Sequence, residues 1–153
     1  MPAETLIQNE SAILTYYPET KIVHHTFLKP ISGEEFREVL NTGIRTLEKH
    51  QAVKWLSDDR KNLALPDEDT EWSKTDWFPR AVKAGWTYWA LVVPDDFLAK
   101  LNMKEFTDSY FDQGLHIAVF SKPDEALKWL EICDLPPKDW INRLGSSSFS
   151  KGA

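Results

Sequence analysis

The sequence predicts an α/β fold: one domain with a mostly parallel five-stranded sheet and an N-terminal antiparallel hairpin. Its 153 residues suit a single hydrophobic core. Apolar runs rich in β-branched and aromatic residues alternate with segments of helical periodicity, which is typical of a parallel sheet with helical crossovers. The expected order of elements is β-β-α-β-α-β-α-β-α.

The first half of the chain predicts a hairpin, a helix and a strand. Two strands are expected within residues 12–27, because β-branched and aromatic residues flank a break at residues 18–20. A helix is expected at 31–51, where Ser32 and Glu35 have the spacing of a capping box and apolar residues then recur at helical intervals. The segment "AVKWLS" predicts the next strand.

The second half predicts three helical regions and two strands. A helix that opens with acids at 67–69 should kink or restart at Pro79. The near-continuous apolar run "WTYWALVV" predicts a strand buried on both faces. Two helical pieces follow, the second capped by Asn102, and then a buried strand "LHIAVF".

The last helix is expected to end at Cys133. We therefore place one domain at residues 11–133, followed by a proline-containing linker and a flexible tail at 134–153.

Composition limits the compartment and the partners. The net charge of −6 disfavours nucleic acid, whose binding usually needs a basic surface. No apolar run reaches the about 20 residues of a membrane helix, so we do not expect an integral membrane protein. The first residues do not form a signal peptide, and the only cysteine excludes an internal disulfide. We expect a cytoplasmic protein.

The chain carries seven tryptophans, more than an ordinary core needs. Most should pack in the core. Some aromatic residues of the helices could instead flank a cleft beside the sheet that accepts an apolar small molecule or a partner helix. These candidates are Trp72, Trp77, Phe78, Phe106 and Tyr110. Ordinary helix-to-sheet packing is the favoured alternative.

Charged residues follow the strand of the stretch "WLSDDRKN". Asp58, Asp59 and Arg60 are expected to brace this loop by charge pairing, although Arg60 and Arg80 are also candidates for binding a ligand or partner. Ligands bind at the carboxyl ends of strands in open sheets, so the strand-end acids could also hold magnesium. Helix capping explains the acids at 95–96 and 124 better.

No motif in the sequence predicts a catalytic residue, a cofactor or a metal. The glycines form no phosphate-binding loop. His24 and His25 should point to opposite faces of a strand, so they cannot share one metal. His116 lies in an expected buried strand and is interpreted as a hydrogen-bonded core residue.

Several residues of the middle segment resemble a known family. The matching residues are Asp58, Arg60, Lys61, Trp77, Phe78, Pro79, Arg80 and Gly85. Together with the order of elements, they resemble the STAS domain of bacterial anti-sigma-factor antagonists and the related SEC14-like (CRAL-TRIO-like) fold, especially a group of uncharacterised bacterial proteins. The resemblance implies a bacterial regulatory module and makes lipid a candidate ligand. It brings no known reaction with it.

One feature of the antagonists is absent. They carry a phosphorylatable serine in an Asp-Ser-(Ser/Thr)-Gly motif, and the corresponding segment here is "ALPDEDTEW". Thr70 is the only hydroxyl residue there, and acids surround it. Phosphorylation would add about two negative charges to an already acidic site, which makes Thr70 a poor phosphorylation candidate.

The sequence therefore favours a non-catalytic, STAS-like binding or regulatory module that engages a protein partner or an apolar small molecule. Two alternatives stay open. One is a magnesium-dependent phosphoryl-transfer or hydrolytic enzyme that uses the strand-end carboxylates. The other is a structural protein that self-associates, for example as a homodimer.

Overall fold

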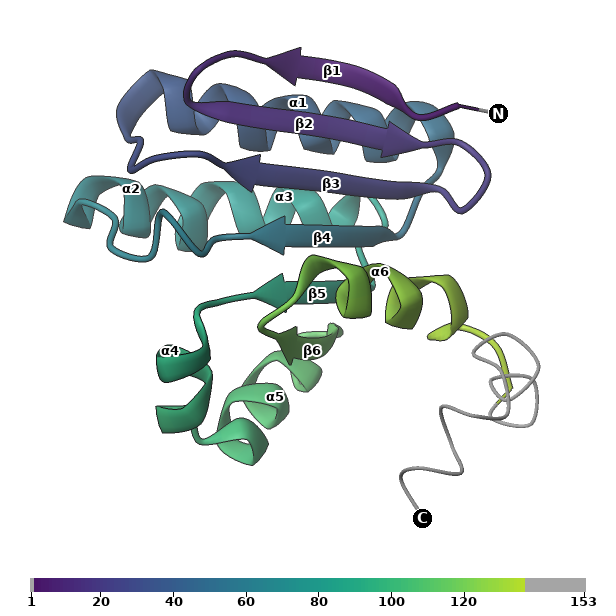
Figure 1. The fold of residues 1–153 in the computed structure, drawn as a ribbon. Coiled ribbons are helices and arrows are strands. Elements are labelled where there is room, and N and C mark those ends of the chain that lie inside the picture. Colours follow the sequence, from purple (N-terminus) through teal and green to yellow (C-terminus); the bar gives the residue numbers. More distant parts are fainter. Residues whose placement is uncertain (1, 137–153) are drawn as a thin grey trace.

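The protein is built on one six-stranded sheet with helices on both faces (Figure 1). The computed structural model describes residues 2–136. The strands are β1 (Glu4–Gln8), β2 (Ala12–Tyr17), β3 (Ile22–Phe27), β4 (Lys54–Asp58), β5 (Tyr88–Val92) and β6 (His116–Phe120). The helices are α1 (Gly33–His50), α2 (Asp67–Trp72), the π-helix η1 (Ser73–Trp77), α3 (Phe78–Lys83), α4 (Asp95–Lys100), α5 (Met103–Phe111) and α6 (Pro123–Ile132).

The strands lie in the sheet in the order in which they occur in the chain. β1 pairs with β2, and β2 with β3, in antiparallel fashion, whereas the three pairings from β3 to β6 are parallel. The α/β class and the antiparallel hairpin are thus confirmed. The parallel register aligns the carboxyl ends of β3, β4 and β5, because Thr26 pairs with Asp58 and Asp58 with Val92.

The sheet has one strand more than the sequence predicted. β1 forms the edge next to β2, so the sheet begins at Glu4, before the expected domain start at residue 11. Most of β1 is exposed, and its pairing is interrupted by an irregularity between Thr5 and Ile7. Such a strand has no alternating apolar pattern to reveal it. The linker and tail were expected at 134–153, and residues 137–153 of this segment lie outside the described residues.

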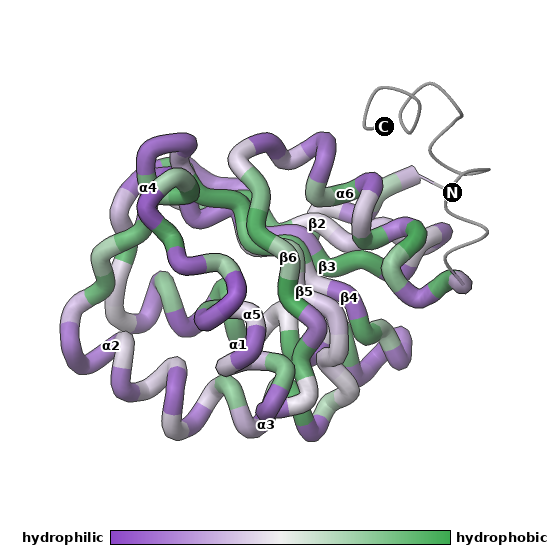
Figure 2. The backbone as a smooth tube through the Cα atoms, turned by 90° about the horizontal axis from the view of Figure 1, so that it is seen from below, coloured by the Kyte–Doolittle hydropathy of each residue, from purple (hydrophilic) through white to green (hydrophobic). Residues whose placement is uncertain are grey.

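Helices cover both faces of the sheet, which buries the central strands on both sides (Figure 2). α1, α3 and α5 lie on one face and α6 on the other. The larger core lies under α1 and includes Trp55 and Leu14. A second core joins α6 to the sheet, with Leu130 against Leu56 and its neighbours, and a third, smaller one includes Leu91, Val93 and Ile117. No helix within residues 2–136 has the length and apolar character needed to span a membrane.

The amino end of α1 is held by a distant residue and not by the expected capping box. The side chain of Ser32 makes no capping hydrogen bond. Instead, the backbone N–H of Gly33 donates to Oδ2 of Asp69 in α2 at 2.9 Å. Because Asp69 is buried, this contact fixes the start of α1 against α2.

The middle of α1 approaches β4 very closely. Gly43 faces the Trp55 indole, and a Cβ atom at Gly43 would lie 1.9 Å from the ring. Only glycine therefore allows this indole to approach the helix backbone so closely. Trp55 is completely buried there.

The chain from Asp67 to Lys83 is continuously helical but widens before Pro79. The backbone N–H of Phe78 donates to the carbonyl of Ser73, which is a π-helical hydrogen bond. Pro79 has no N–H to donate, and its ring would collide with a carbonyl in a regular α-helix. The predicted kink or restart at Pro79 takes this form.

β5 lies between β4 and β6, and its last three residues are buried, in line with the predicted buried strand, whereas β6 is the opposite edge of the sheet and is only partly buried. The interpretation of His116 as a core residue is wrong. His116 is exposed at the start of β6, where its ring stacks on Tyr88 at 5.3 Å. An apolar run alone does not distinguish a central strand from an edge strand that has helices on both faces.

Candidate functional site

A cavity of about 440 Å³ lies beside the carboxyl ends of β3 and β4 and against Trp89 of β5. The sheet forms one wall, through residues such as His25 and Ser57. α1 contributes Phe36, η1 contributes Trp77, and α5 contributes Tyr110. The cavity is therefore enclosed by elements from four separate parts of the chain.

Aromatic rings line a large part of the cavity. They are Phe27, Phe36, Trp77, Phe78, Trp86, Trp89 and Tyr110. The centroid of the Trp86 ring lies 5.3 Å from that of Trp77 and 5.1 Å from that of Trp89. The Tyr110 ring stands edge-on to Trp89 at 5.0 Å. These contacts lock the rings into a preformed wall.

The polar atoms of the three indoles are used inside the protein. Nε1 of Trp77 donates to the carbonyl of Leu40 at 2.9 Å. Nε1 of Trp89 donates to the Ser57 hydroxyl at 3.0 Å, and Nε1 of Trp86 to the carbonyl of Tyr88 at 3.2 Å. What these rings offer to the cavity is therefore apolar surface and π-faces.

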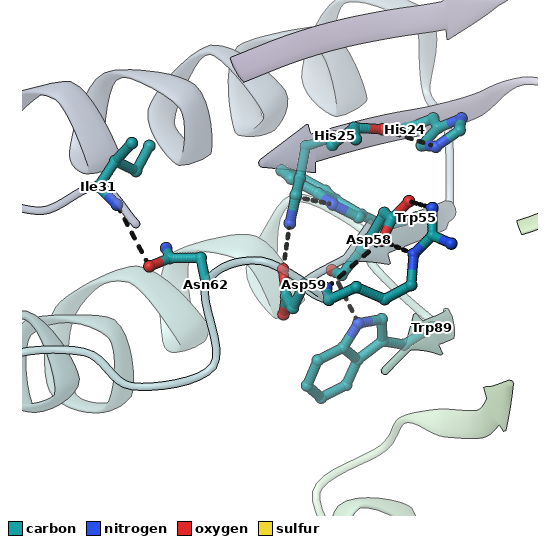
Figure 3. A network of polar contacts seen from close by, with 11 residues as sticks. His24, His25, Ile31, Trp55, Asp58, Asp59, Asn62 and Trp89 are labelled. Carbon is teal, nitrogen blue, oxygen red and sulfur yellow. Dashed lines mark hydrogen bonds and ion pairs between the residues drawn. The ribbon is translucent and has the colours of Figure 1, made fainter. Parts of the chain in front are cut away.

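A chain of three side chains forms the polar end of the cavity (Figure 3). Nε1 of Trp55 donates to Nδ1 of His25 at 3.0 Å, and Nε2 of His25 lies 2.7 Å from Oδ1 of Asp59. Since an indole can only donate, Nδ1 of His25 carries no proton and Nε2–H is the donor to Asp59. The imidazole in this arrangement is neutral.

Asp59 is the charged member of this set of three hydrogen-bonded side chains, and its side chain is 25% exposed. Asn62 lies nearby on the cavity lining. Its Oδ1 accepts from the N–H of Ile31 at 3.3 Å, while its Nδ2 is buried without a partner among residues 2–136. The remaining polar groups, including Lys74 and Ser109, come from the helices.

Tyr110 brings a hydroxyl to the wall opposite the sheet. Burial raises the pKa of this hydroxyl above its usual value of 10. Tyr110 therefore stays protonated and neutral around pH 7, available as a hydrogen-bond donor or acceptor.

His24 lies on the opposite face of the sheet from His25, as the strand alternation predicts. Its Nδ1 is 2.9 Å from the Tyr17 hydroxyl and its Nε2 is 3.2 Å from Oγ1 of Thr26. Burial, helped by the neighbouring His25, lowers the pKa of His24 to about 4, against the opposing effect of Asp58. His24 is therefore a neutral structural group outside the cavity.

The stretch "WLSDDRKN" contains two separate carboxylate interactions. Arg60 binds Asp58 with two hydrogen bonds of 2.8 Å, on the face of the sheet opposite Ser57. This pairing raises the pKa of the Arg60 guanidinium. Asp59 pairs with His25 and not with Arg60. Arg60 thus braces the loop through Asp58 and does not line the cavity.

Three of the five aromatic candidates, Trp77, Phe78 and Tyr110, line the cavity. Trp72 and Phe106 lie behind the wall. The Trp72 ring is 6.2 Å from Phe36, and the Phe106 ring is 5.1 Å from Tyr110.

The candidates Arg80 and Thr70 lie outside the cavity. The Arg80 guanidinium is exposed and donates to Asp76 at 2.8 Å and to Asn41 at 2.9 Å. The Thr70 hydroxyl donates to the carbonyl of Pro66 at 3.2 Å within its own helix. Neither residue contacts the polar end of the site.

The strand-end acids do not converge on one point. Asp58 and Asp59 lie in different environments. Asp95 and Asp96 lie in the first turn of α4, and Asp124 lies in the first turn of α6. Within the part of the chain that the structure describes, no three His, Cys, Asp or Glu side chains come together to form a metal site.

Several residues of the site had no distinctive signal in the sequence. His25 and Ser57 are inward positions of adjacent strands, and Trp86 and Trp89 belong to the run expected to be buried. The sequence placed His25, Ser57 and Trp89 in expected strands, and Trp86 at the start of one, without indicating which of them face the cavity. It did not show that the space in front of them is open.

The geometry of this cavity has to be interpreted on its own terms. Comparisons with protein-family models, with curated proteins and with solved structures return no match. The fold and site define an α/β protein with an aromatic cavity and one carboxylate at its polar end.

Proposed function

We propose that this chain is a non-catalytic, STAS-like binding module whose cavity takes an apolar small molecule. The observation that supports it most directly is the aromatic cavity of about 440 Å³ beside the carboxyl ends of β3 and β4. Ligand pockets of about 300–1,000 Å³ with mostly apolar walls and few polar groups are typical small-molecule sites. Open α/β sheets bind their ligands at this edge.

The polar groups of the cavity support binding over catalysis. A histidine acts as a general base through a free ring nitrogen. Here Trp55 occupies Nδ1 of His25, and Nε2 carries the proton donated to Asp59. Ser57, the hydroxyl of the adjacent strand, accepts from Trp89. The arrangement thus has no activated nucleophile.

The STAS-like assignment rests on the residues of the resemblance and on their positions. Trp77 and Phe78 line the cavity, and Pro79 follows the π-helix that shapes its wall. Asp58 and Arg60 fix the loop that carries Asp59. The residues of the resemblance therefore include both wall and support of the proposed site. A regulatory role would follow if the ligand changes the exposed surface of η1 and α5.

The proposal is tested by titrating the purified protein with 3-phenylpropan-1-ol while the indole N–H signals are followed by NMR. We expect the signals of Trp77, Trp86 and Trp89 to shift saturably. Trp129, on α6 at the other face, is the internal control and should not move. Equal small shifts at all four indoles would contradict binding in the cavity.

A second variant tests the location by blocking the entrance. Ser109 is an exposed residue of α5 on the cavity lining, so Ser109→Trp should fill the mouth and weaken binding at least tenfold. Glu105→Trp places the same indole elsewhere on α5, away from the cavity lining, and should bind like the wild type. Unchanged affinity in a folded Ser109→Trp variant would overturn the proposed site.

A further inference from the structure

Asp59 differs from the other two buried or partly buried carboxylates near the site. Asp58 has the bidentate guanidinium of Arg60, and Asp69 has the Gly33 N–H with the Arg37 guanidinium 3.7 Å away. Asp59 has only the neutral His25 as a side-chain partner, and no lysine or arginine within residues 2–136 forms an ion pair with it. A carboxylate withdrawn from water is normally paired with a cation.

The hydrogen-bond chain holds this carboxylate in a fixed orientation. Trp55 fixes the tautomer of His25, and His25 binds only Oδ1 of Asp59. The backbone on either side is also tied, since the Asp59 N–H donates to the carbonyl of Val92 at 3.0 Å. Oδ2 receives no hydrogen bond from the described part of the chain. It is therefore a preorganised acceptor on the cavity lining.

The walls around this acceptor favour a positive charge. The indole Nε1–H groups of Trp77, Trp86 and Trp89 are all engaged elsewhere, so their rings are available to the cavity as faces. Aromatic faces attract cations, and tryptophan does so most strongly. Among the described residues, Lys74 is the only lysine or arginine on the lining, and it is exposed on η1, where water solvates it.

The geometry points to an organic cation as the ligand: an amine carried on an apolar or aromatic body, with its ammonium on Oδ2 of Asp59. This inference rests on the proposed function and specifies its ligand class. The apolar body occupies the aromatic wall, and the ammonium supplies the charge that Asp59 otherwise lacks. An organic anion would meet the Asp59 carboxylate at the polar end and is disfavoured.

The test compares three probes with the same apolar body: 3-phenylpropylamine, 3-phenylpropan-1-ol and 3-phenylpropanoate. Calorimetric titration at pH 7 should give the order amine, alcohol, acid. We expect the amine to bind about tenfold tighter than the alcohol, as is typical when a hydrogen bond to a carboxylate becomes charge-assisted. In Asp59→Asn, the ratio of amine to alcohol affinity should fall to about one. Asp112→Asn removes an equal charge away from the cavity lining and should keep the wild-type ratio.

The outcomes separate the two proposals. The amine assignment is overturned if the alcohol binds as tightly as the amine, or if the preference for the amine over the alcohol persists in Asp59→Asn. In both cases the cavity remains a binding site. If the acid binds most tightly, the amine assignment is also overturned. Lys74 would then be the charged group of the lining that the ligand contacts. If Asp59→Asn does not fold, the wild-type order alone decides. Failure of all three probes overturns the proposed function, and the amine assignment with it.

Discussion

Gly43 of α1 lies directly against the indole ring of Trp55 in β4. A Cβ atom at this glycine would come within 1.9 Å of the ring. The same indole donates to His25. The Trp55 side chain therefore contacts both α1 and the polar end of the cavity. The Trp55 indole occupies the space that a Cβ atom would take if residue 43 were not glycine.

The first prediction concerns Gly43→Ala. In an exposed helix, alanine would stabilise by roughly 0.5–1 kcal/mol over glycine. Here we expect a loss of about 1–3 kcal/mol, because the methyl group overpacks a rigid core. Urea denaturation measures the free energy of unfolding. In the background of Trp55→Phe the cost of Gly43→Ala should fall by half or more, and an unchanged cost there would contradict the clash.

The second prediction compares the two residues that could cap α1. Asp69→Ala removes the acceptor of the Gly33 N–H and should lower the free energy of unfolding by about 1 kcal/mol or more. Ser32→Ala should change it by less than about 0.5 kcal/mol, since the Ser32 side chain makes no capping bond. Chemical denaturation of both variants checks this order. A larger loss for Ser32→Ala than for Asp69→Ala would show that the local capping box, and not Asp69, holds the start of α1.

The third prediction is a pH dependence that comes from His24. Burial lowers the pKa of His24 from its ordinary 6.5 to about 4 in the folded protein. Between these values the unfolded chain binds a proton that the folded protein does not, so stability is full above pH 6.5 and falls as the pH drops towards 4. The loss from this one group is at most about 3 kcal/mol.

The variant His24→Gln isolates this contribution because glutamine does not titrate. Free energies of unfolding measured from pH 7.5 to pH 4 should fall less steeply for the variant than for the wild type. Parallel curves would show that another group causes the acid sensitivity.

The fourth prediction concerns the reactivity of the single cysteine. Burial raises the pKa of the Cys133 thiol to about 12, partly offset by Lys54. Since the thiolate is the reactive form, iodoacetamide at pH 8 should alkylate the folded protein at least about a hundredfold more slowly than the urea-unfolded chain. Mass spectrometry after timed quenching measures both rates. Similar rates would mean that the thiol is accessible and ordinary in the native state.

The fold class could be predicted because its signals are long and periodic. Phe36 to Leu47 repeat at helical spacing, and "WTYWALVV" is a continuous run rich in aromatic and β-branched residues, which favours a buried strand. β1 could not be predicted, because most of its residues are exposed and its stability depends on pairing with β2. The cap of α1 by Asp69 could not be predicted either, because Asp69 lies 36 residues after Gly33 in the sequence.

The site was predictable only on its helical side. Trp77, Phe78 and Tyr110 lie in helices that pack on the sheet, so they were candidates for the wall of a cleft, although ordinary helix-to-sheet packing was favoured. The contact of His25 with Asp59 spans 34 residues and depends on the register between β3 and β4. The sequence contains no signal for that register. It also cannot show that seven rings pack around an open volume and not on one another.

Because every strand pairs with its immediate predecessor in the chain, this sheet can grow strand by strand while the ribosome is still working. No strand has to wait for a later one to be inserted beside it. α6 is the exception to this early completion, because within residues 2–136 it is the helix that covers the face presenting Ile22, Leu56 and Val92. Until α6 emerges, the nascent protein exposes this apolar surface, and this interval is when a chaperone would have most to hold.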